Sequence, residues 1–178
     1  MHISARINTT KKTGIPVYRF HDHSHFTAVD KINRGVLRQL GWQGYFDGHF
    51  RFSFSLERTG EELIAEIGER LGLSHLRYIG PPGLRVRTVA TLFGAWGERK
   101  IYDCLNDDGI DLVLAGEACE WSLCEWARDA VELGMRRGLL LLGHMGSERE
   151  GMAYIADEIA AAHPALRVVY LDAGETYR

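Results

Sequence analysis

Short apolar segments alternate with helix-like segments through the second half of the chain, and this alternation limits the possible folds more than any other feature. The apolar segments, each about as long as a strand, are residues 86–92, 111–114, 139–142 and 167–171. The helix-like segments are residues 120–133 and 147–162. Strands that alternate with helices build a parallel sheet covered by helices. We therefore expect an α/β fold with a mostly parallel sheet flanked by helices.

The first half of the chain also predicts helices and strands. Residues 29–40 carry apolar side chains at helical spacing, and Gly41 follows them as a typical helix C-cap. Thr59 and Glu62 have the spacing of a capping box at the start of a second helix. The aromatic and glycine-rich stretch 42–50 predicts a loop. Strands are predicted at residues 15–20, 51–56 and 75–79.

Composition and net charge exclude several classes of protein. The chain has 178 residues, enough for one domain, and we expect residues 1–178 to form a single domain. The formal net charge of −3 gives no electrostatic reason to expect a nucleic acid or an anionic membrane as partner. No apolar run approaches the roughly 20 residues of a membrane-spanning helix. The three cysteines include no C-x-x-C pair, so we expect free thiols and a cytoplasmic protein.

Polar residues with useful chemistry follow several of the predicted strands. In parallel sheets, ligands bind beyond the carboxyl ends of the strands. The residues found there are His21 to His25, Gly94, Glu117 and His144. We therefore expect a functional site where these strand ends meet.

The segment Gly143-His-Met-Gly-Ser-Glu148 carries the strongest local signal. His144 leaves the end of an apolar strand, and Ser147 and Glu150 have the spacing of a capping box, which would place Glu148 in the first helical turn. A neighbouring imidazole and carboxylate suit zinc, iron or manganese. The alternative is that Glu148 only complements the helix dipole and that His144 is an ordinary loop histidine.

A second signal is the segment His21-Asp-His-Ser-His25, which holds three of the eight histidines of the chain. If the preceding strand continued, the imidazoles of His21, His23 and His25 would share one face. Such a group favours metal binding, and a pH-sensitive surface cluster is the alternative.

Glu117 could act as a base, hold a metal ligand in place or be a plain surface charge. The segment Gly94-Ala-Trp-Gly97 is a weak phosphate-loop candidate, because a tight strand-to-helix turn needs the same glycines. The sequence contains no P-loop, G-x-S-x-G or G-x-G-x-x-G motif. Nucleophilic catalysis by serine or cysteine therefore has no support.

Four segments occur in a characteristic order: Arg19-Phe-His-Asp-His-Ser-His25, Gly94-Ala-Trp-Gly97, Asp111-Leu-Val-Leu-Ala-Gly-Glu117 and Gly143-His-Met-Gly-Ser-Glu148. This order resembles the Nif-three-like family, whose members are often labelled GTP cyclohydrolase 1 type 2 homologs. The resemblance extends over roughly residues 13 to 172, and the late G-H-x-x-S-E pattern is its most specific part.

The resemblance implies an α/β fold, assembly as a ring-shaped hexamer and a dinuclear metal site. The family's ligands are an early histidine pair, an acidic residue after a mid-chain strand, and the His and Glu of the late motif. His144 and Glu148 match the late motif. His25 stands four residues after His21, where much of the family has an aspartate ligand, and His21 or His23 could serve instead. The early H-H-P or H-E-P motif has no counterpart, so the resemblance implies a chain truncated at its N-terminus.

The resemblance also implies a function, a divalent-metal-binding protein that uses zinc, iron or manganese. One expectation is a metal-dependent hydrolase of the GTP cyclohydrolase type that acts on a nucleotide-like small molecule, with Glu117 as its catalytic acid or base. The alternative is a non-catalytic metal-binding scaffold or interaction protein. We further expect a homo-oligomer, because residues 42–52 carry more aromatic side chains than a monomer normally exposes.

Overall fold

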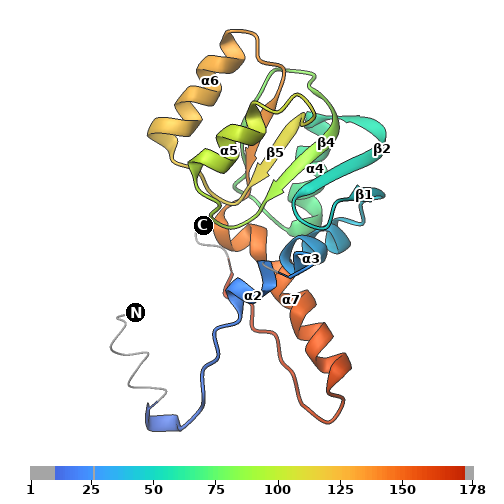
Figure 1. Ribbon diagram of the computed structural model, residues 1–178, viewed down its shortest axis with the longest axis vertical. Coiled ribbons are helices and arrows are strands. Elements are labelled where there is room, and N and C mark those ends of the chain that lie inside the picture. The colour runs from blue at the N-terminus through green and yellow to red at the C-terminus, as the bar shows by residue number, and fades with distance from the viewer. Residues whose placement is uncertain (1–10, 26, 175–178) are drawn as a thin grey trace.

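The computed structural model describes residues 11–25 and 27–174, except for the side chains of residues 21 and 22. Its centre is a six-stranded sheet in the order β1-β2-β4-β5-β6-β3 (Figure 1). The strands are β1 (Gly44–Phe46), β2 (Arg51–Thr59), β3 (Arg77–Ile79), β4 (Arg85–Leu92), β5 (Leu112–Ala115) and β6 (Gly138–Leu141). Strands β4, β5 and β6 are parallel, and antiparallel pairing adds β2 and β1 at one edge and β3 at the other. The α/β fold with a helix-flanked sheet is confirmed, and the sheet is mixed with a parallel centre.

Helices cover both faces of this sheet. Those that build the core and the site are α2 (His21–His25), α3 (Lys31–Leu40), α4 (Gly60–Leu71), α5 (Glu98–Leu105), the π-helix η1 (Glu120–Cys124), α6 (Glu125–Glu132) and α7 (His144–Ala162). Leu112 and Leu114 of β5 pack in the core with α3, α4 and α7, whereas Val113 and Ala115 pack with α5 and α6. Strands β5 and β6 are buried along their whole length, which explains their uninterrupted apolar sequences. Among the described residues, no helix combines the length and the apolarity that crossing a bilayer requires.

Two helix ends follow the predicted capping residues, the start of α4 and the end of α3. Thr59 caps α4: its hydroxyl accepts a hydrogen bond from the Glu62 N–H, and its own N–H donates to the Glu62 carboxylate. Gly41 ends α3 at a φ of 63°, a left-handed conformation that glycine adopts without strain. Asp30 is the N-cap of α3, so this helix begins two residues later than the predicted 29–40.

Helices α3 and α7 pack backbone against backbone through two glycines. A Cβ atom on Gly35 would lie 2.6 Å from the carbonyl oxygen of Glu150, and a Cβ atom on Gly151 would lie 2.5 Å from Cα of Ile32. No larger side chain fits at such distances, because close-packed atoms cannot overlap in this way. The contact therefore fixes the start of α3, and the residues just before it, relative to α7.

Two of the predicted strands are wrong. Residues 15–20 and 167–171, all of them described, have no regular secondary structure and lie away from the sheet (Figure 1). Val17 is 76% exposed and Leu171 is 82% exposed. A strand needs a neighbour for its backbone hydrogen bonds, and the strands in the described part of the chain pair elsewhere. A short segment rich in apolar and aromatic residues therefore does not suffice to form a strand.

The aromatic stretch after α3 differs from the expectation in two ways. Strand β1 lies inside the predicted loop 42–50 and pairs with β2. Trp42 and Phe52 are buried, with ring centroids 5.5 Å apart, whereas Tyr45 is exposed. Four of its five aromatic side chains therefore lie in or against the core, and the stretch exposes less aromatic surface than the argument for oligomerisation assumed.

Candidate metal centre

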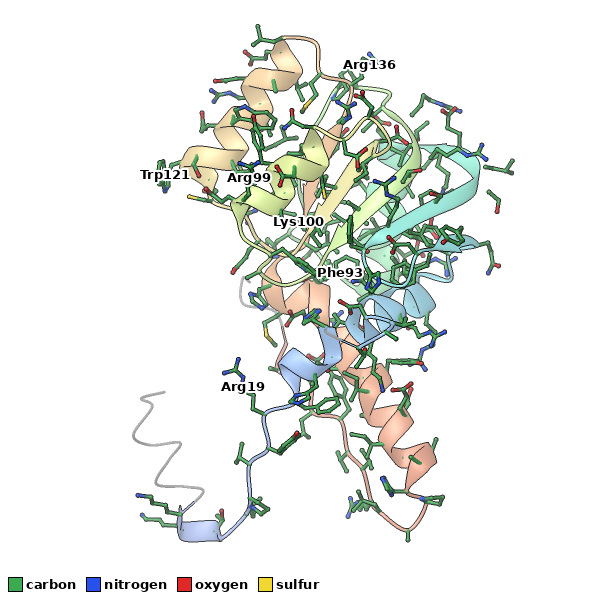
Figure 2. All side chains as sticks on the ribbon, in the orientation of Figure 1. Arg19, Phe93, Arg99, Lys100, Trp121 and Arg136 are labelled. Atoms are coloured by element: carbon green, nitrogen blue, oxygen red, sulfur yellow. The ribbon has the colours of Figure 1, made fainter. Side chains whose placement is uncertain are left out.

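The candidate site lies where the carboxyl ends of β4, β5 and β6 meet α2 and the first turn of α7 (Figure 1). Phe93 follows β4 directly and marks this end of the sheet in Figure 2. Glu117 stands two residues after β5, and His144 stands three residues after β6. The parallel centre of the sheet thus gathers chemically active side chains at one edge, as expected for this class of fold.

Glu148 occupies the centre of the site and is buried. Its Oε1 lies 3.6 Å from His25 Nε2, and its Oε2 lies 3.4 Å from His144 Nε2. Each oxygen of the carboxylate therefore faces a different imidazole. A buried carboxylate is stable only beside positive charge or hydrogen-bond donors. A protonated His25, or a cation held between the two imidazoles, would meet that requirement.

Gly94 makes room for this carboxylate. It has a φ of 78°, and a Cβ atom on it would lie 2.1 Å from Glu148 Oε1. The hydroxyl of Ser147 accepts a hydrogen bond of 2.9 Å from the Gly94 N–H and donates one of 2.8 Å to the His144 carbonyl. Ser147 therefore lies inside α7, which begins at His144, and the predicted capping box of Ser147 and Glu150 is wrong.

His25 is held by a second carboxylate. Its Nδ1 lies 2.8 Å from Asp30 Oδ2, and its ring meets the edge of Trp96 at a centroid distance of 6.2 Å. The hydrogen bond with Asp30, followed by the nearby Glu148 carboxylate, raises the pKa of His25 from 6.5 to about 9. In the metal-free protein the imidazole therefore carries the positive charge that the two carboxylates require. A cation that replaced this proton would meet the same electrostatic demand.

His144 and Glu117 form the solvent-facing side of the site. His144 Nδ1 lies 3.3 Å from Glu117 Oε1, and the two side chains are 39% and 54% exposed. A cavity of about 310 Å³ adjoins Glu117 and is lined by Ala95, Gly97, Glu98, Glu117, Ala118 and Cys119. This side of the site therefore has room for a small molecule.

The separations between imidazoles and carboxylates distinguish shared ligation from direct hydrogen bonding. An N–H···O hydrogen bond spans about 2.7–3.2 Å, whereas two ligands of one tetrahedral zinc ion lie roughly 3.3 Å apart. The three separations of 3.6, 3.4 and 3.3 Å fit ligand pairs better than hydrogen bonds. Within the described ranges, no group of three or more His, Cys, Asp or Glu side chains is arranged to hold a metal ion. These side chains are of the types that bind metals, and they lie in pairs at separations typical of two ligands of one ion. A complete site with three or more ligands needs a shift of side chains or additional ligands.

The structure brings together four of the six predicted site residues, His25, Glu117, His144 and Glu148. His23 is exposed, and its ring stacks on Phe20 at a centroid distance of 5.6 Å. The side chain of His21 lies outside the described part of the chain. Residues 21–25 form helix α2 rather than a continued strand, so the condition under which the three imidazoles would share one strand face is not met. Residues two apart in a helix point in different directions.

Sequence reasoning did not identify Asp30 as part of the site. Its position before an amphipathic segment marks it as a helix N-cap, which is one of its two roles. Its second role, the contact with His25, depends on the turn between α2 and α3. No local sequence signal reports that turn.

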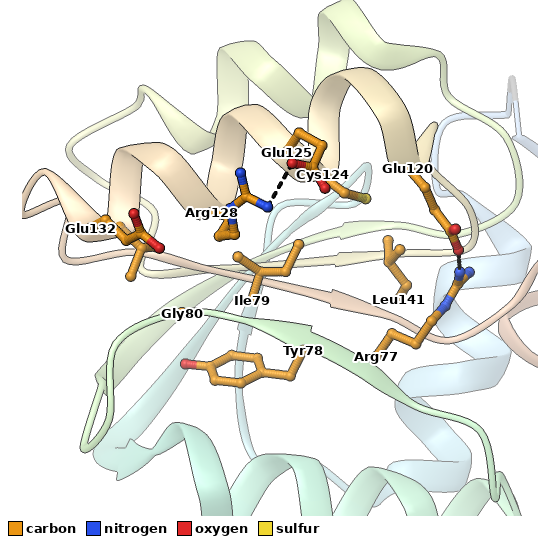
Figure 3. A pocket seen from close by; sticks show the side chains of 11 residues that line it. Arg77, Tyr78, Ile79, Gly80, Glu120, Cys124, Glu125, Arg128, Glu132 and Leu141 are labelled. Atoms are coloured by element: carbon orange, nitrogen blue, oxygen red, sulfur yellow. Dashed lines mark hydrogen bonds and ion pairs between the residues drawn. The ribbon is translucent and has the colours of Figure 1, made fainter.

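A second cavity of about 590 Å³ lies between β3 and α6 (Figure 3). Its two arginines are paired with glutamates, Arg77 with Glu120 and Arg128 with Glu125. None of the six predicted site residues lines this cavity. The candidate chemistry therefore lies at the carboxyl ends of the strands and not here.

The chain has a helix-flanked α/β fold with histidine and glutamate side chains at the carboxyl edge of its parallel strands. Comparison with known proteins identifies its family. The model of the family Duf34/NIF3 (NGG1p interacting factor 3) matches residues 2–175. The chain belongs to this family. No curated protein sequence matches the chain.

Several solved structures share the fold. The protein ybgI, of unknown function, gives a TM-score of 0.62 at 23% identity, over 81% of this chain and 56% of that one. The protein TTHA1606 from Thermus thermophilus gives 0.56 at 19% identity, over 79% and 54%. A Bacillus cereus protein related to NIF3 gives 0.52 at 22% identity, over 65% and 29%. The chain thus spans between 29% and 56% of the length of these proteins, and the likeness shows the fold alone.

Proposed function

We propose that this chain binds divalent metal ions through His25, His144 and Glu148. The observation that carries the proposal is the buried carboxylate of Glu148, which turns one oxygen toward each imidazole. The ligands come from α2 and α7. Helix α2 contacts α3, and the glycine contact holds α3 against α7. Imidazole and carboxylate donors suit zinc, iron(II) or manganese.

Glu117 extends the proposal from binding to catalysis. It lines the 310 Å³ cavity and lies 3.3 Å from His144. A carboxylate in this place can take a proton from a small molecule in the cavity or return one to it. Divalent ions, when bound, would supply Lewis acidity and an activated water. We therefore propose a metal-dependent hydrolase of the GTP cyclohydrolase type, acting on a nucleotide-like substrate.

A non-catalytic metal-binding scaffold is the second candidate function. The observation that favours it is the lack, in the described part of the chain, of three side chains that converge as ligands of one ion. Paired ligands can hold an ion that stabilises the fold without leaving it the geometry that hydrolysis needs. Metal binding and turnover must therefore be measured separately.

Metal content tests the binding proposal. The wild type, His144→Ala and His163→Ala are loaded with zinc, passed through a desalting column and analysed by mass spectrometry of the elements. His163 is the matched control, because it is an exposed histidine at the far end of α7. We expect the wild type and His163→Ala to retain zinc and His144→Ala to retain less. Equal zinc in all three proteins would rule out the assignment.

Turnover separates the two candidate functions. GTP is followed by absorbance with zinc, manganese or iron(II) present, for the wild type, Glu117→Gln and Glu148→Gln. Turnover that falls in Glu117→Gln while its metal content is retained supports the hydrolase. A wild type that binds metal but does not react favours the scaffold. Turnover that survives Glu148→Gln would place the catalytic centre elsewhere.

We also propose that the chain self-associates, as a ring-shaped hexamer would require. The apolar side chains that support this proposal lie in the extended segments, among them Val17, Tyr18, Val169 and Leu171, all of which are exposed. Contiguous exposed apolar residues often form a contact surface between proteins. Light scattering that gives a monomer mass at micromolar concentration would contradict the proposal.

A further inference from the structure

Asp30 uses both of its carboxylate oxygens, and each oxygen has a different partner. Oδ2 contacts His25 Nδ1 at 2.8 Å. Oδ1 accepts a hydrogen bond of 2.9 Å from the Asn33 N–H and so caps α3. The Asp30 N–H donates to the Gly48 carbonyl at 2.8 Å, and the residue is buried. Asp30 is therefore held in position by hydrogen bonds other than its contact with the imidazole.

This arrangement determines which nitrogen of His25 faces Glu148. Because Nδ1 is engaged by Asp30, Nε2 is left on the side of Glu148, 3.6 Å from Oε1. The edge-on ring of Trp96 limits rotation of the imidazole from another side. Histidines that ligate metals commonly give their other ring N–H to a carboxylate, which fixes the tautomer and the ring orientation.

We propose that Asp30 is a positioning residue for metal binding by His25. It keeps a proton on Nδ1 and directs the lone pair of Nε2 toward the ion that Glu148 also faces. This inference rests on the proposed metal-binding function. It adds a residue that contacts no metal itself and acts only through His25.

The helix cap and the positioning role can be separated by substitution. Asp30→Asn keeps the size of the side chain, and asparagine caps helices about as well as aspartate. When its carbonyl oxygen caps α3, its amide group faces His25 and donates to Nδ1. The imidazole proton then moves to Nε2 and must be displaced before that nitrogen can bind a metal. The same change of tautomer occurs when an aspartate beside a catalytic histidine is replaced by asparagine. Asp30→Ser also keeps the cap but is too short to reach the imidazole.

The experiment measures zinc dissociation constants by competition with a chromophoric chelator for the wild type, Asp30→Asn, Asp30→Ser and Thr59→Ala. Thr59→Ala is the control for capping, because it removes the cap of α4 without touching the site. We expect Asp30→Asn to bind zinc about 10–100-fold more weakly, the range for residues that hold a metal ligand in place. Asp30→Ser should lie between Asp30→Asn and the wild type. Thr59→Ala should lower the unfolding temperature without changing zinc affinity.

A spectroscopic readout follows the imidazole itself. In ¹H–¹⁵N spectra of the zinc-bound wild type, we expect a protected Nδ1–H signal of His25 that is lost in Asp30→Asn. The visible spectrum of the cobalt(II)-substituted wild type should likewise change in this variant. Zinc affinity that is equal in the wild type and Asp30→Asn would overturn the positioning role while leaving the metal site intact. A wild type that binds no zinc would overturn the proposed function, and the positioning role with it.

Discussion

The two halves of the candidate site differ in burial and in the structure that holds them. In the inner half, the side chains of His25 and Glu148 are only 9% and 12% exposed, and Asp30 and Gly94 confine them. In the outer half, His144 and Glu117 face solvent beside a cavity. The inner half is fixed by packing between helices, whereas the outer half belongs to loop ends and a first helical turn.

The difference indicates that the two halves have different roles. A confined pair of donors loses little freedom when it binds an ion, so the inner half should dominate metal affinity. A solvent-exposed pair can exchange ligands and admit a substrate, so the outer half should have the larger effect on catalytic turnover. Glu148 belongs to both halves, because its two oxygens face different imidazoles.

Removing the shared carboxylate should have the largest effect. Glu148→Gln keeps the shape of the side chain but removes the negative charge that both halves use, so zinc affinity should fall by more than roughly 100-fold, beyond the loss expected for a residue that only holds a ligand. Glu150→Gln is the matched control, since Glu150 lies in the same helix and pairs with Arg149. Titration with a competing chelator gives the zinc dissociation constants of both variants. Similar losses in the two variants would mean that charge on α7, and not the site, governs affinity.

Displacing the carboxylate should have the next largest effect. Gly94 and Gly97 both have positive φ, at 78° and 76°, so alanine at either position costs roughly 1–3 kcal/mol of backbone strain. Only at Gly94 would the new Cβ meet Glu148, at 2.1 Å, whereas at Gly97 no described atom lies within 4 Å. Gly94→Ala should therefore weaken zinc binding by about tenfold or more, and Gly97→Ala should leave it unchanged. Equal affinities would show that Glu148 does not depend on the loop after β4.

Forcing α3 away from α7 should weaken the inner half through the fold. In Gly35→Ala, the added Cβ would lie 2.6 Å from the Glu150 carbonyl oxygen, and such overpacking costs roughly 1–3 kcal/mol. Gly68→Ala in α4 is the control, because its nearest neighbour outside that helix is the Leu73 carbonyl oxygen at 3.3 Å. Urea unfolding should show a clear loss of stability for Gly35→Ala and little change for Gly68→Ala. The opposite order would refute the backbone-to-backbone packing of α3 and α7.

Neutralising the outer carboxylate should have the smallest effect on affinity. Glu117 is exposed, and a surface ion pair is worth about 0.2–1 kcal/mol, so Glu117→Gln should change zinc affinity by roughly fivefold at most. Chelator competition on this variant and on Glu148→Gln measures the contrast between the halves. If Glu117→Gln lost as much affinity as Glu148→Gln, the division between an inner and an outer half would be wrong.

The sequence predicts the parts of this molecule that depend on local patterns. Strands β4, β5 and β6 and the helices after β5 and β6 follow from apolar runs and helical spacing, and His144 and Glu117 follow from their places after strands. The capping box at Thr59 is likewise a local signal and is confirmed. These features require only the residues near them in the chain.

The parts that the sequence did not predict depend on contacts between distant segments. Residues 167–171 form a short apolar segment like that of a strand, but a strand exists only where a neighbour supplies hydrogen bonds. Asp30 reaches His25 only because the chain turns between α2 and α3, and Gly94 matters only because Glu148 packs on it. A local pattern of residue types contains no information about such tertiary contacts.

Anomalous diffraction at the zinc absorption edge, from crystals of the zinc-loaded chain, tests the central claim most directly. The claim is that the Glu148 carboxylate is shared between His25 and His144. The account predicts an anomalous peak within bonding distance of Glu148 and of Nε2 of at least one of these histidines. Zinc bound at another place, with Glu148 free of metal, would contradict it.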